Sequence, residues 1–467
     1  MSARTLDRGT DLARLRPSHA GYARKGRIIR SVTSARGAPV GLAAPGLKVT
    51  RLELFYDLVF VFAAIHINAV AAKNLHFVSL VATFLLMAAL WLVWSRFALL
   101  GNNLRADQGI MPIIGFMIMA LVFVSVATLP NFGHQPPRPR PGVPQVIPGE
   151  FVFPTCYLLI WILEAVALRG GARLHPDLGR SWWKATPLLA ASTVLLFLAA
   201  IVPRAVGRDA AAATIIAFWI GAVGIGYLTL LRTEPLTVVS AGHWAERYGQ
   251  IILIALGESI ISLGLGANLS TVTPLTVPVI GGALLGIALI CALWWTYFDI
   301  RAYAAEQVMH RTHGADRSRL ARDAYTLLHL PMVFGIILLS VGLKQTMAHL
   351  IVQTSEQGQT MLEPARLPVL YGGVLIYLLA LLGFHLRTIG SVALGCALPI
   401  PLIGALLPFA HRLPAFAGLA LLTTITILGI AVDAVRARGW RRGMRRRRLA
   451  EQRALEAEES RWRREHR

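Results

Sequence analysis

Carboxylates in otherwise apolar segments are the residues of this sequence that could do chemistry. Glu53 and Asp57 stand four residues apart in ELFYDLVFVF, so a helix would place both on one face, with Arg51 one turn away. Glu258 stands in a second apolar segment, IILIALGESIISLG. An ionisable group inside a bilayer is costly unless it is paired or hydrated. These acids therefore predict a path for a cation or a proton, and for Glu53 and Asp57 a local ion pair is an equal alternative.

His66 could bring a base to the same path. It follows Asp57 by nine residues, and in an ungapped comparison of the two segments it falls next to the depth of Glu258. A buried acid beside an imidazole could exchange a proton near neutral pH. A histidine that only binds a backbone carbonyl is the equal alternative. The remaining candidates are Glu246 on the path and, in supporting roles, Arg51, Phe55, Arg247, Ser259, Asp299 and Arg301.

The sequence holds no motif for catalysis or for a metal. It lacks a P-loop, a nucleophile elbow, an H-E-x-x-H pair and a dinucleotide fingerprint. Cys156, Cys291 and Cys396 lie far apart in apolar runs, without the spacing of metal ligands. We therefore expect no enzyme activity, no cofactor and no metal site.

The elements that position these residues are long apolar helices. Of the 467 residues 55% are apolar and 15% are charged, against about 25% charged in soluble domains, and the mean hydropathy is +0.58. Runs of about twenty apolar residues can cross a hydrocarbon core of about 30 Å. We predict an all-α integral membrane protein of about twelve transmembrane helices, over residues 52–70, 77–99, 110–129, 151–168, 183–202, 210–231, 247–266, 275–298, 325–343, 368–386, 389–409 and 414–436.

The distribution of basic residues predicts the orientation of these helices. The net charge is +22, and Lys and Arg near helix ends are retained in the cytoplasm. With the amino terminus inside, the outer loops hold eight of the 46 basic residues: Lys73, Arg138, Arg140, Arg204, Arg208, Lys344, Arg366 and Arg412. The pattern therefore indicates membrane topology with both termini in the cytoplasm, and it argues against a nucleic-acid partner.

The segments outside the helices are basic or rich in proline. Residues 1–50 predict a disordered basic arm, and residues 437–467 a basic cytoplasmic tail in which a short charged helix is expected. Both could meet anionic lipid headgroups, and a protein partner is an equal alternative for the tail. Residues 130–150 contain seven prolines and predict an extended outer loop.

Similar features recur in the two halves of the chain. ELFYDLVFVFAAIHIN aligns without a gap with ERYGQIILIALGESII, so Glu53 matches Glu246 and Phe55 matches Tyr248. Each half then continues with a Trp-rich helix and four further spans. We therefore predict two parallel six-helix repeats, over residues 51–232 and 243–436, related by an axis along the membrane normal. The interface between the halves is the expected path.

Three motifs resemble a known family. The run Glu53 to Val61 (ELFYDLVFV), the segment His243 to Gly249 (HWAERYG) and the sequence LGES over 256–259 are similar to the bacterial low temperature requirement protein A family, LtrA. The resemblance spans residues 50 to 436. It implies a multi-pass protein of the bacterial inner membrane, named for a growth phenotype in the cold.

A weaker resemblance is to the endolysosomal transmembrane potassium channel family, which has two six-helix repeats and an R-x-x-x-F-S-D motif. Arg51, Phe55 and Asp57 match this motif, whereas Tyr56 replaces its serine. The resemblance implies a pore lined by the first helix of each repeat, with Ile65 near its constriction.

These observations favour a channel or a proton-coupled transporter for a small ion or solute, with its path between the first and seventh helices. The alternative is a non-transporting membrane scaffold or sensor linked to growth in the cold. The sequence leaves open the ion, the direction of movement and whether the protein forms a homodimer.

Overall fold

A computed structural model describes residues 41–44, 46–73, 76–128, 149–172, 176–206, 208–232, 238–266, 276–354 and 366–465. Within these ranges the chain is helical, and an isolated β-bridge pairs Leu42 with Leu104. Most of the predicted basic arm and of the proline-rich loop lies outside them. The longer helices are α2 (Arg51–Lys73), α3 (Phe77–Asn103), α4 (Met111–Ala127), α5 (Gly149–Ala172), α6 (Pro176–Ile201), α7 (Arg208–Arg232), α8 (Ala241–Gly266), α9 (Val277–Phe298), α12 (Leu328–Thr354), α13 (Arg366–Ile389), α16 (Ala415–Arg436) and α17 (Arg438–Glu465).

Shorter helical elements connect these helices. They are η2 (Val202–Arg204), α10 (Arg301–Arg311), α11 (Gly314–Leu320), the π-helix η3 (Ala321–Leu327), α14 (Leu394–Ala397), α15 (Pro399–Leu406) and η4 (Leu407–Arg412). The predicted span over 389–409 corresponds to the consecutive pieces α14, α15 and η4. Pro399 and Pro408 lie at the starts of α15 and η4, where a missing backbone N–H is tolerated.

The fold class predicted from the sequence is confirmed. Eleven helical segments in the described part of the chain are long and apolar enough to cross a membrane. All the predicted spans except the one over 110–129 overlap one of these eleven segments. The predicted span over 110–129 corresponds to α4, an apolar helix of only 17 residues. The protein is therefore an all-α, multi-pass membrane protein.

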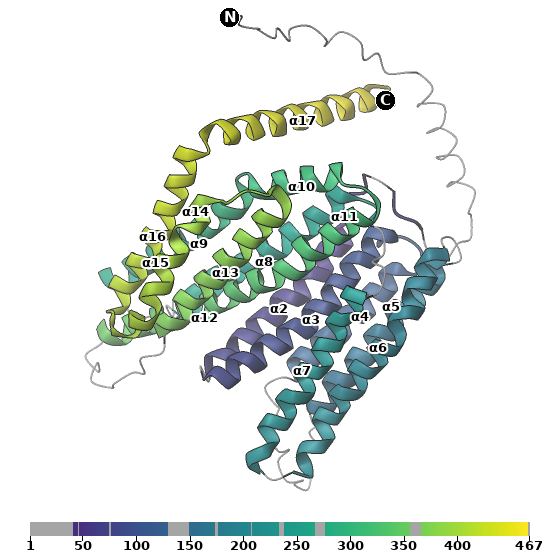
Figure 1. Ribbon diagram of the computed structural model, residues 1–467, viewed down its shortest axis with the longest axis horizontal. Coiled ribbons are helices and arrows are strands. Elements are labelled where there is room, and N and C mark those ends of the chain that lie inside the picture. The colour runs from purple at the N-terminus through teal and green to yellow at the C-terminus, as the bar shows by residue number, and fades with distance from the viewer. Residues whose placement is uncertain are drawn as a thin grey trace, which may run out of the picture. The chain divides into compact units, whose positions relative to one another are not determined.

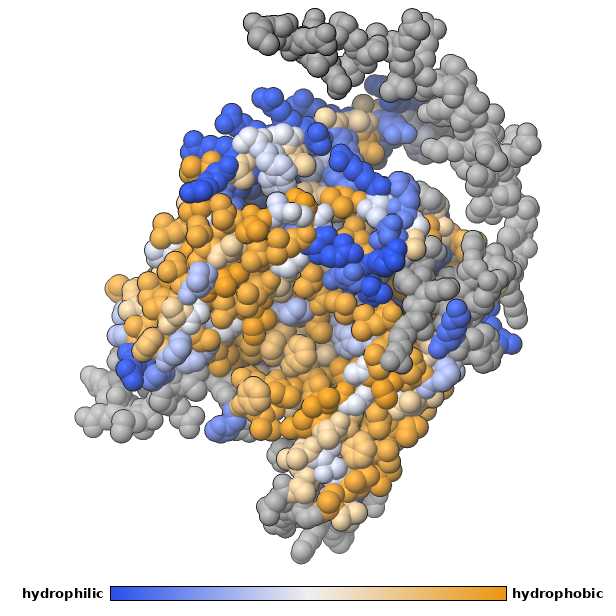
Figure 2. Space-filling model, in the orientation of Figure 1, coloured by the Kyte–Doolittle hydropathy of each residue, from blue (hydrophilic) through white to orange (hydrophobic). Residues whose placement is uncertain are grey.

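The surface of the helices is apolar, as contact with lipid requires. Large side chains such as Leu284 on α9 and Leu428 on α16 are more than half exposed. Figure 2 shows hydrophobic residues covering the middle of this face, while hydrophilic residues gather at the end where α10, α11 and α17 lie. Trp294 and Trp295 are also exposed on α9, near its end, where aromatic side chains are common at a membrane interface.

Helix α12 is the most buried of the candidate spans and packs closely against α13. A Cβ added to Gly335 would lie 2.6 Å from the Gly373 carbonyl oxygen, and one added to Gly373 would lie 2.6 Å from the Leu339 nitrogen. The two backbones meet because both helices present glycine at the contact. The π-helix η3 precedes α12, and Pro331 follows it by one turn. A proline cannot donate to the carbonyl four residues before it, which favours a widened turn at this place.

The first and seventh of the predicted spans, α2 and α8, lie side by side (Figure 1). The hydrogen bonds that join them include those between Glu53 and His243, between Asp57 and Arg247 and between Asn68 and Glu258. The partners are 190 residues apart in each of these three pairs, so the two helices run in the same direction. Parallel repeats require this direction, although the duplication itself stays a prediction.

The charged tail forms α17, a helix of 28 residues without a buried side chain. Its first turns are held by Asp299, the residue after α9, which pairs with Arg441 and with Arg445. Glu451 accepts hydrogen bonds from Tyr303 and Gln307 of α10. The helix expected in the tail is therefore present, and it is longer than predicted.

Candidate functional site

The first group of buried ionisable residues, the charged cluster, consists of Glu53 and Asp57 on α2 and His243 and Arg247 on α8. Arg247 Nη1 donates to Asp57 Oδ2 at 2.6 Å and to the Glu53 carbonyl oxygen at 3.0 Å. His243 Nε2 lies 2.9 Å from Glu53 Oε1. All four side chains are at most 1% exposed. Both pairs stand four residues apart, so each helix presents one face to the other.

Two residues of α3 complete the surroundings of the charged cluster. Trp94 Nε1 donates to Asp57 Oδ1 at 2.9 Å, and the Arg247 guanidinium lies 5.5 Å from the centre of the Trp94 ring. Asn102 Nδ2 lies 3.1 Å from His243 Nδ1. The cluster is therefore enclosed by a third helix, and water has no access to its ionic groups in this arrangement.

The contacts of Asn102 determine the tautomer of His243. Asn102 Oδ1 accepts from the backbone N–H groups of Val239 and Ser240, so its Nδ2 is the atom that faces Ser240 O and His243 Nδ1. Since Nδ2 is a donor, His243 Nδ1 accepts and Nε2 carries the proton donated to Glu53. With a neutral His243, two carboxylates face one guanidinium. The cluster can thus take up one proton and become electrically neutral.

A second group of buried polar residues, the amide cluster, lies three turns further along both helices. It consists of Asn68 on α2, Glu258 and Ser262 on α8, and Ser340 on α12. Asn68 follows Asp57 by eleven residues and Glu258 follows Arg247 by eleven, which is about three turns and about 16 Å along each helix. The two clusters therefore lie on the same faces of α2 and α8.

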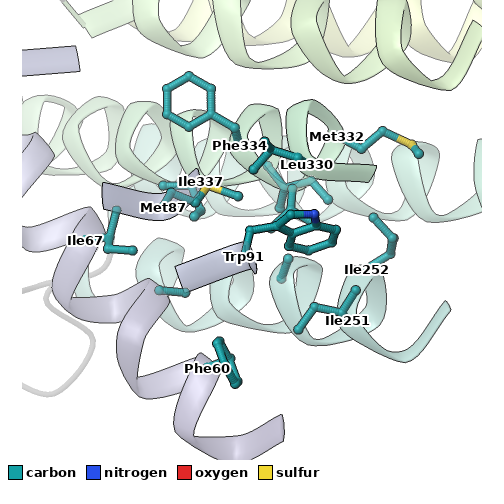
Figure 3. Close-up of a cluster of buried hydrophobic side chains, with 14 of the residues drawn as sticks. Phe60, Ile67, Met87, Trp91, Ile251, Ile252, Leu330, Met332, Phe334 and Ile337 are labelled. Carbon is teal, nitrogen blue, oxygen red and sulfur yellow. The ribbon is translucent and has the colours of Figure 1, made fainter. Parts of the chain in front are cut away.

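An apolar layer separates the two clusters. Figure 3 shows its side chains, which come from α2, α3, α8 and α12, with Trp91 in the middle of the group. The layer contains a partly open cavity of about 50 Å³, lined by residues such as Ala63, Ile67 and Ala255. This volume could hold a few water molecules, but the apolar walls offer them no hydrogen-bond partners. The charged cluster, the apolar layer and the amide cluster thus follow one another along the interface between α2 and α8.

The structure places the predicted path residues in different surroundings. Asp57 and Glu258 lie on the interface between α2 and α8, but each is dry and has local partners. His66 Nδ1 lies 3.1 Å from the Phe62 carbonyl oxygen, and Asn68, not His66, binds Glu258. The alternative of a carbonyl-bound histidine therefore describes His66 better than a pairing with Glu258.

The predicted equivalence of Glu53 and Glu246 is not reflected in their surroundings. Glu53 is buried, whereas Glu246 is exposed and accepts a hydrogen bond from the Val49 N–H at 3.3 Å. Phe55 is half exposed on the face of α2 that meets Phe116 of α4. These residues lie beside the charged cluster and are not part of it.

The residues predicted to have supporting roles also lie in different surroundings. Arg247 is central, whereas Arg51 is exposed and the local ion pair expected for it is replaced by the pair from α8. Ser259 donates to the Ala255 carbonyl of its own helix. Asp299 and Arg301 join other helices to the end of the bundle, since Asp299 binds α17 and Arg301 pairs with Asp433 of α16.

Several residues that complete the two clusters were not among the predicted site residues. These are Asn68, Trp94, Asn102, His243, Ser262 and Ser340. A spacing signal was available for some of them, because Ser262 follows Glu258 by one turn and Asn68 follows Asp57 by three. For Ser340 the signal was a polar residue in a very apolar helix.

Comparisons with known proteins match the family that the sequence motifs resemble. A family model described as bacterial low temperature requirement A protein (LtrA) matches residues 48–431. An uncharacterised protein of Rhizobium meliloti (strain 1021) is 25% identical over 318 residues, which cover 65% of this chain and 70% of the relative. No solved structure matches the chain. The family match includes every residue of both clusters and more than half of the chain, and the protein therefore belongs to the bacterial low temperature requirement A family of multi-pass membrane proteins.

Proposed function

We propose that this LtrA-family protein transports a small ion across the bacterial inner membrane, along a path between α2 and α8. The observation that carries the proposal is the pair of buried polar clusters on one helix interface, separated by an apolar layer. Two ionisable positions about 16 Å apart on the same faces would serve as steps on either side of a barrier.

The energetics of the apolar layer favour a closed state of such a path. A dehydrated ion in an apolar interior is strongly disfavoured, so the layer blocks passage while Trp91 and its neighbours stay packed. Transport requires α2 and α8 to separate enough for water or for a polar side chain to enter the layer. The cavity supplies part of the free volume for this movement.

The charge balance of the charged cluster supports coupling to protons. With His243 neutral, Glu53, Asp57 and Arg247 leave one excess negative charge in a site without access to water. Uptake of one proton would remove that charge, and its release would weaken the contact between α2 and α8. The opening of the interface would then depend on protonation.

The distribution of basic residues supports an orientation with both termini in the cytoplasm. Arginines gather on α11 and on α17, at the end where Asp299 follows α9. Lys and Arg are retained on the cytoplasmic side of bacterial membranes. The exposed arginines of α17 would there meet anionic lipid headgroups.

Flux through proteoliposomes tests the proposal. The full chain is reconstituted with a trapped pH indicator, Na⁺ or K⁺ gradients are applied, and the internal pH and cation content are followed. We expect wild-type flux well above that of protein-free vesicles, and Asp57→Asn and Glu258→Gln at the protein-free rate. Asp316→Asn, which alters an exposed ion pair on α11, is the matched control.

Two results would contradict the proposed path. Wild-type protein that moves neither protons nor cations above the background of empty vesicles would exclude transport of these ions. Undiminished flux in both the Asp57 and the Glu258 variants would exclude the interface between α2 and α8. Size-exclusion profiles of the variants separate a loss of flux from a loss of folding.

A non-transporting scaffold or sensor is the second candidate, and α17 favours it. This helix presents 28 residues with no buried side chain, a surface suited to lipid or to a protein partner. Deleting residues 1–45 and 440–467 distinguishes the two candidates. A strain that loses growth in the cold while flux is retained would favour the scaffold, and dispensable tails would favour transport.

A further inference from the structure

In the amide cluster, the amide nitrogen of Asn68 faces more oxygen atoms than its two hydrogens can satisfy. Asn68 Nδ2 lies 3.0 Å from Glu258 Oε1, 3.1 Å from Ser262 Oγ and 2.6 Å from Ser340 Oγ. Ser262 Oγ also donates to Glu258 Oε1 at 2.6 Å. An amide nitrogen carries two hydrogens and here faces three oxygens from two helices. One position in the protein interior is therefore surrounded by oxygen on several sides.

Two further oxygens of this cluster are buried without a partner. They are Asn68 Oδ1 and Glu258 Oε2, and both residues are at most 2% exposed. In the described part of the chain, no Lys, Arg or His forms an ion pair with Glu258. A buried carboxylate without a compensating charge is among the most costly groups in a protein. A cation bound here would give the two unpartnered oxygens a partner and would balance the charge of the carboxylate.

We propose that the amide cluster binds one monovalent metal cation, with Asn68, Glu258, Ser262 and Ser340 as ligands. This inference rests on the proposed function and names the class of ion that the path carries. Rotation of the Asn68 amide by half a turn exchanges the positions of Nδ2 and Oδ1. Asn68 then contributes its amide oxygen as a ligand, together with the oxygens of Glu258, Ser262 and Ser340. Carboxylate, amide and hydroxyl oxygens are ligands of hard cations.

The charge of the site selects a monovalent ion. Glu258 is the one acidic residue among the four ligands, so a single positive charge makes the site neutral. A divalent ion would leave a net positive charge in an interior that is otherwise apolar. The ligands come from α2, α8 and α12, and so occupation of the site would hold these three helices together on the far side of the apolar layer.

Beyond the amide cluster, α12 carries a further polar side chain, that of Gln345. Gln345 follows Ser340 by five residues on α12, and its Nε2 donates to the Ala72 carbonyl oxygen at 3.2 Å. Gln345 Oε1 is buried without a hydrogen-bond partner. An amide oxygen at this position would provide a step for a cation that enters between α2 and α12.

Thermal unfolding of the purified full chain in detergent tests the site without requiring transport. The midpoint is measured against increasing LiCl, NaCl or KCl, with N-methyl-D-glucamine chloride keeping the ionic strength constant. We expect a saturable rise of the midpoint with at least one of the three metal cations, because a ligand that binds only the folded state stabilises it. Glu258→Gln should abolish this rise, and Ser340→Ala should weaken the apparent affinity about tenfold.

The control is Ser125→Ala, which removes a buried serine whose hydroxyl donates to the Val122 carbonyl of its own helix. It should keep the wild-type response. A wild-type midpoint equal in all four salts would overturn the cation site, as would a Glu258→Gln protein that still responds. A midpoint that depends on pH but not on the metal would assign the site to a proton instead, or to the ammonium of Lys344, one turn beyond Ser340. Binding without flux would refute the proposed path and leave the site intact, so the two failures are distinguishable.

Discussion

Replacing Asp57 by Asn tests how strongly the charged cluster holds α2 to α8. Arg247 and Asp57 are both fully buried, and Nη1 lies 2.6 Å from Oδ2. Asn has nearly the size of Asp, and its amide oxygen can still accept from Trp94, but its amide nitrogen then faces Arg247, so the substitution removes the charge and the hydrogen bond from the guanidinium. Loss of one member of a buried ion pair costs about 3–5 kcal/mol, because the other charge stays uncompensated. Glu53 Oε1 lies 3.9 Å from Arg247 Nε and offsets part of this, so we expect about 3 kcal/mol.

The assay is equilibrium unfolding of the full chain in mixed micelles, followed by circular dichroism. Asp316→Asn is the matched control, because Asp316 also lies 2.6 Å from its arginine, Arg319, but both side chains are more than half exposed. An exposed pair contributes roughly 0–1 kcal/mol. The double variant Asp57→Asn/Arg247→Gln should lose less stability than the sum of its single variants, since it leaves the net charge of the cluster as in the wild type. Equal losses at positions 57 and 316, or additive single variants, would refute the reasoning.

Three further substitutions test the packing by the same unfolding assay or by hydrogen exchange. Gly373→Ala should cost about 1–3 kcal/mol, because its Cβ would lie 2.6 Å from a backbone nitrogen of α12, whereas Gly372→Ala has open space and should be neutral or slightly stabilising. Trp91→Phe should cost about 2 kcal/mol, because it enlarges the cavity and removes the hydrogen bond that the indole donates to the Thr326 carbonyl, while Trp295→Phe on the lipid-facing surface should cost much less. Asp299→Asn should speed amide exchange in the first turns of α17, with α12 as the unchanged reference.

A specific result would contradict each of these three predictions. Similar losses for the two glycine variants would mean that α12 and α13 are not in close contact. Similar losses for the two tryptophan variants would place both indoles in comparable surroundings. Unchanged exchange in α17 would show that Asp299 does not hold the tail helix.

The positions of the spans could be predicted because their cause is local. A segment in hydrocarbon must satisfy its backbone groups internally and present apolar side chains over about twenty residues. Both requirements can be read from consecutive residues, and so the predicted spans coincide with helices. The predicted span over 389–409 differs from the others, because it is not one continuous helix. Its prolines divide it into α14, α15 and η4, although the whole segment is still long and apolar enough to cross a membrane.

The faces of the helices could also be predicted, but their partners could not. The spacing of Glu53 and Asp57 placed both acids on one face of a helix, as observed. The nearest base along the chain was Arg51, and the base that binds Asp57 is Arg247, which is 190 residues away. Similarly, the depth of His66 matched that of Glu258, yet Asn68 is the residue whose side chain points toward α8.

The sequence by itself therefore determined the class of protein, the approximate spans and which residues share a helical face, because hydrophobicity and helical periodicity act over a few turns. Only the tertiary structure decided which residues pair between α2 and α8, that both acidic positions are dry, and that Ser340 of α12 joins Asn68 and Glu258. The physical reason is that the contact between two helices depends on how every side chain of both faces fits against its neighbours, and no local pattern contains that information.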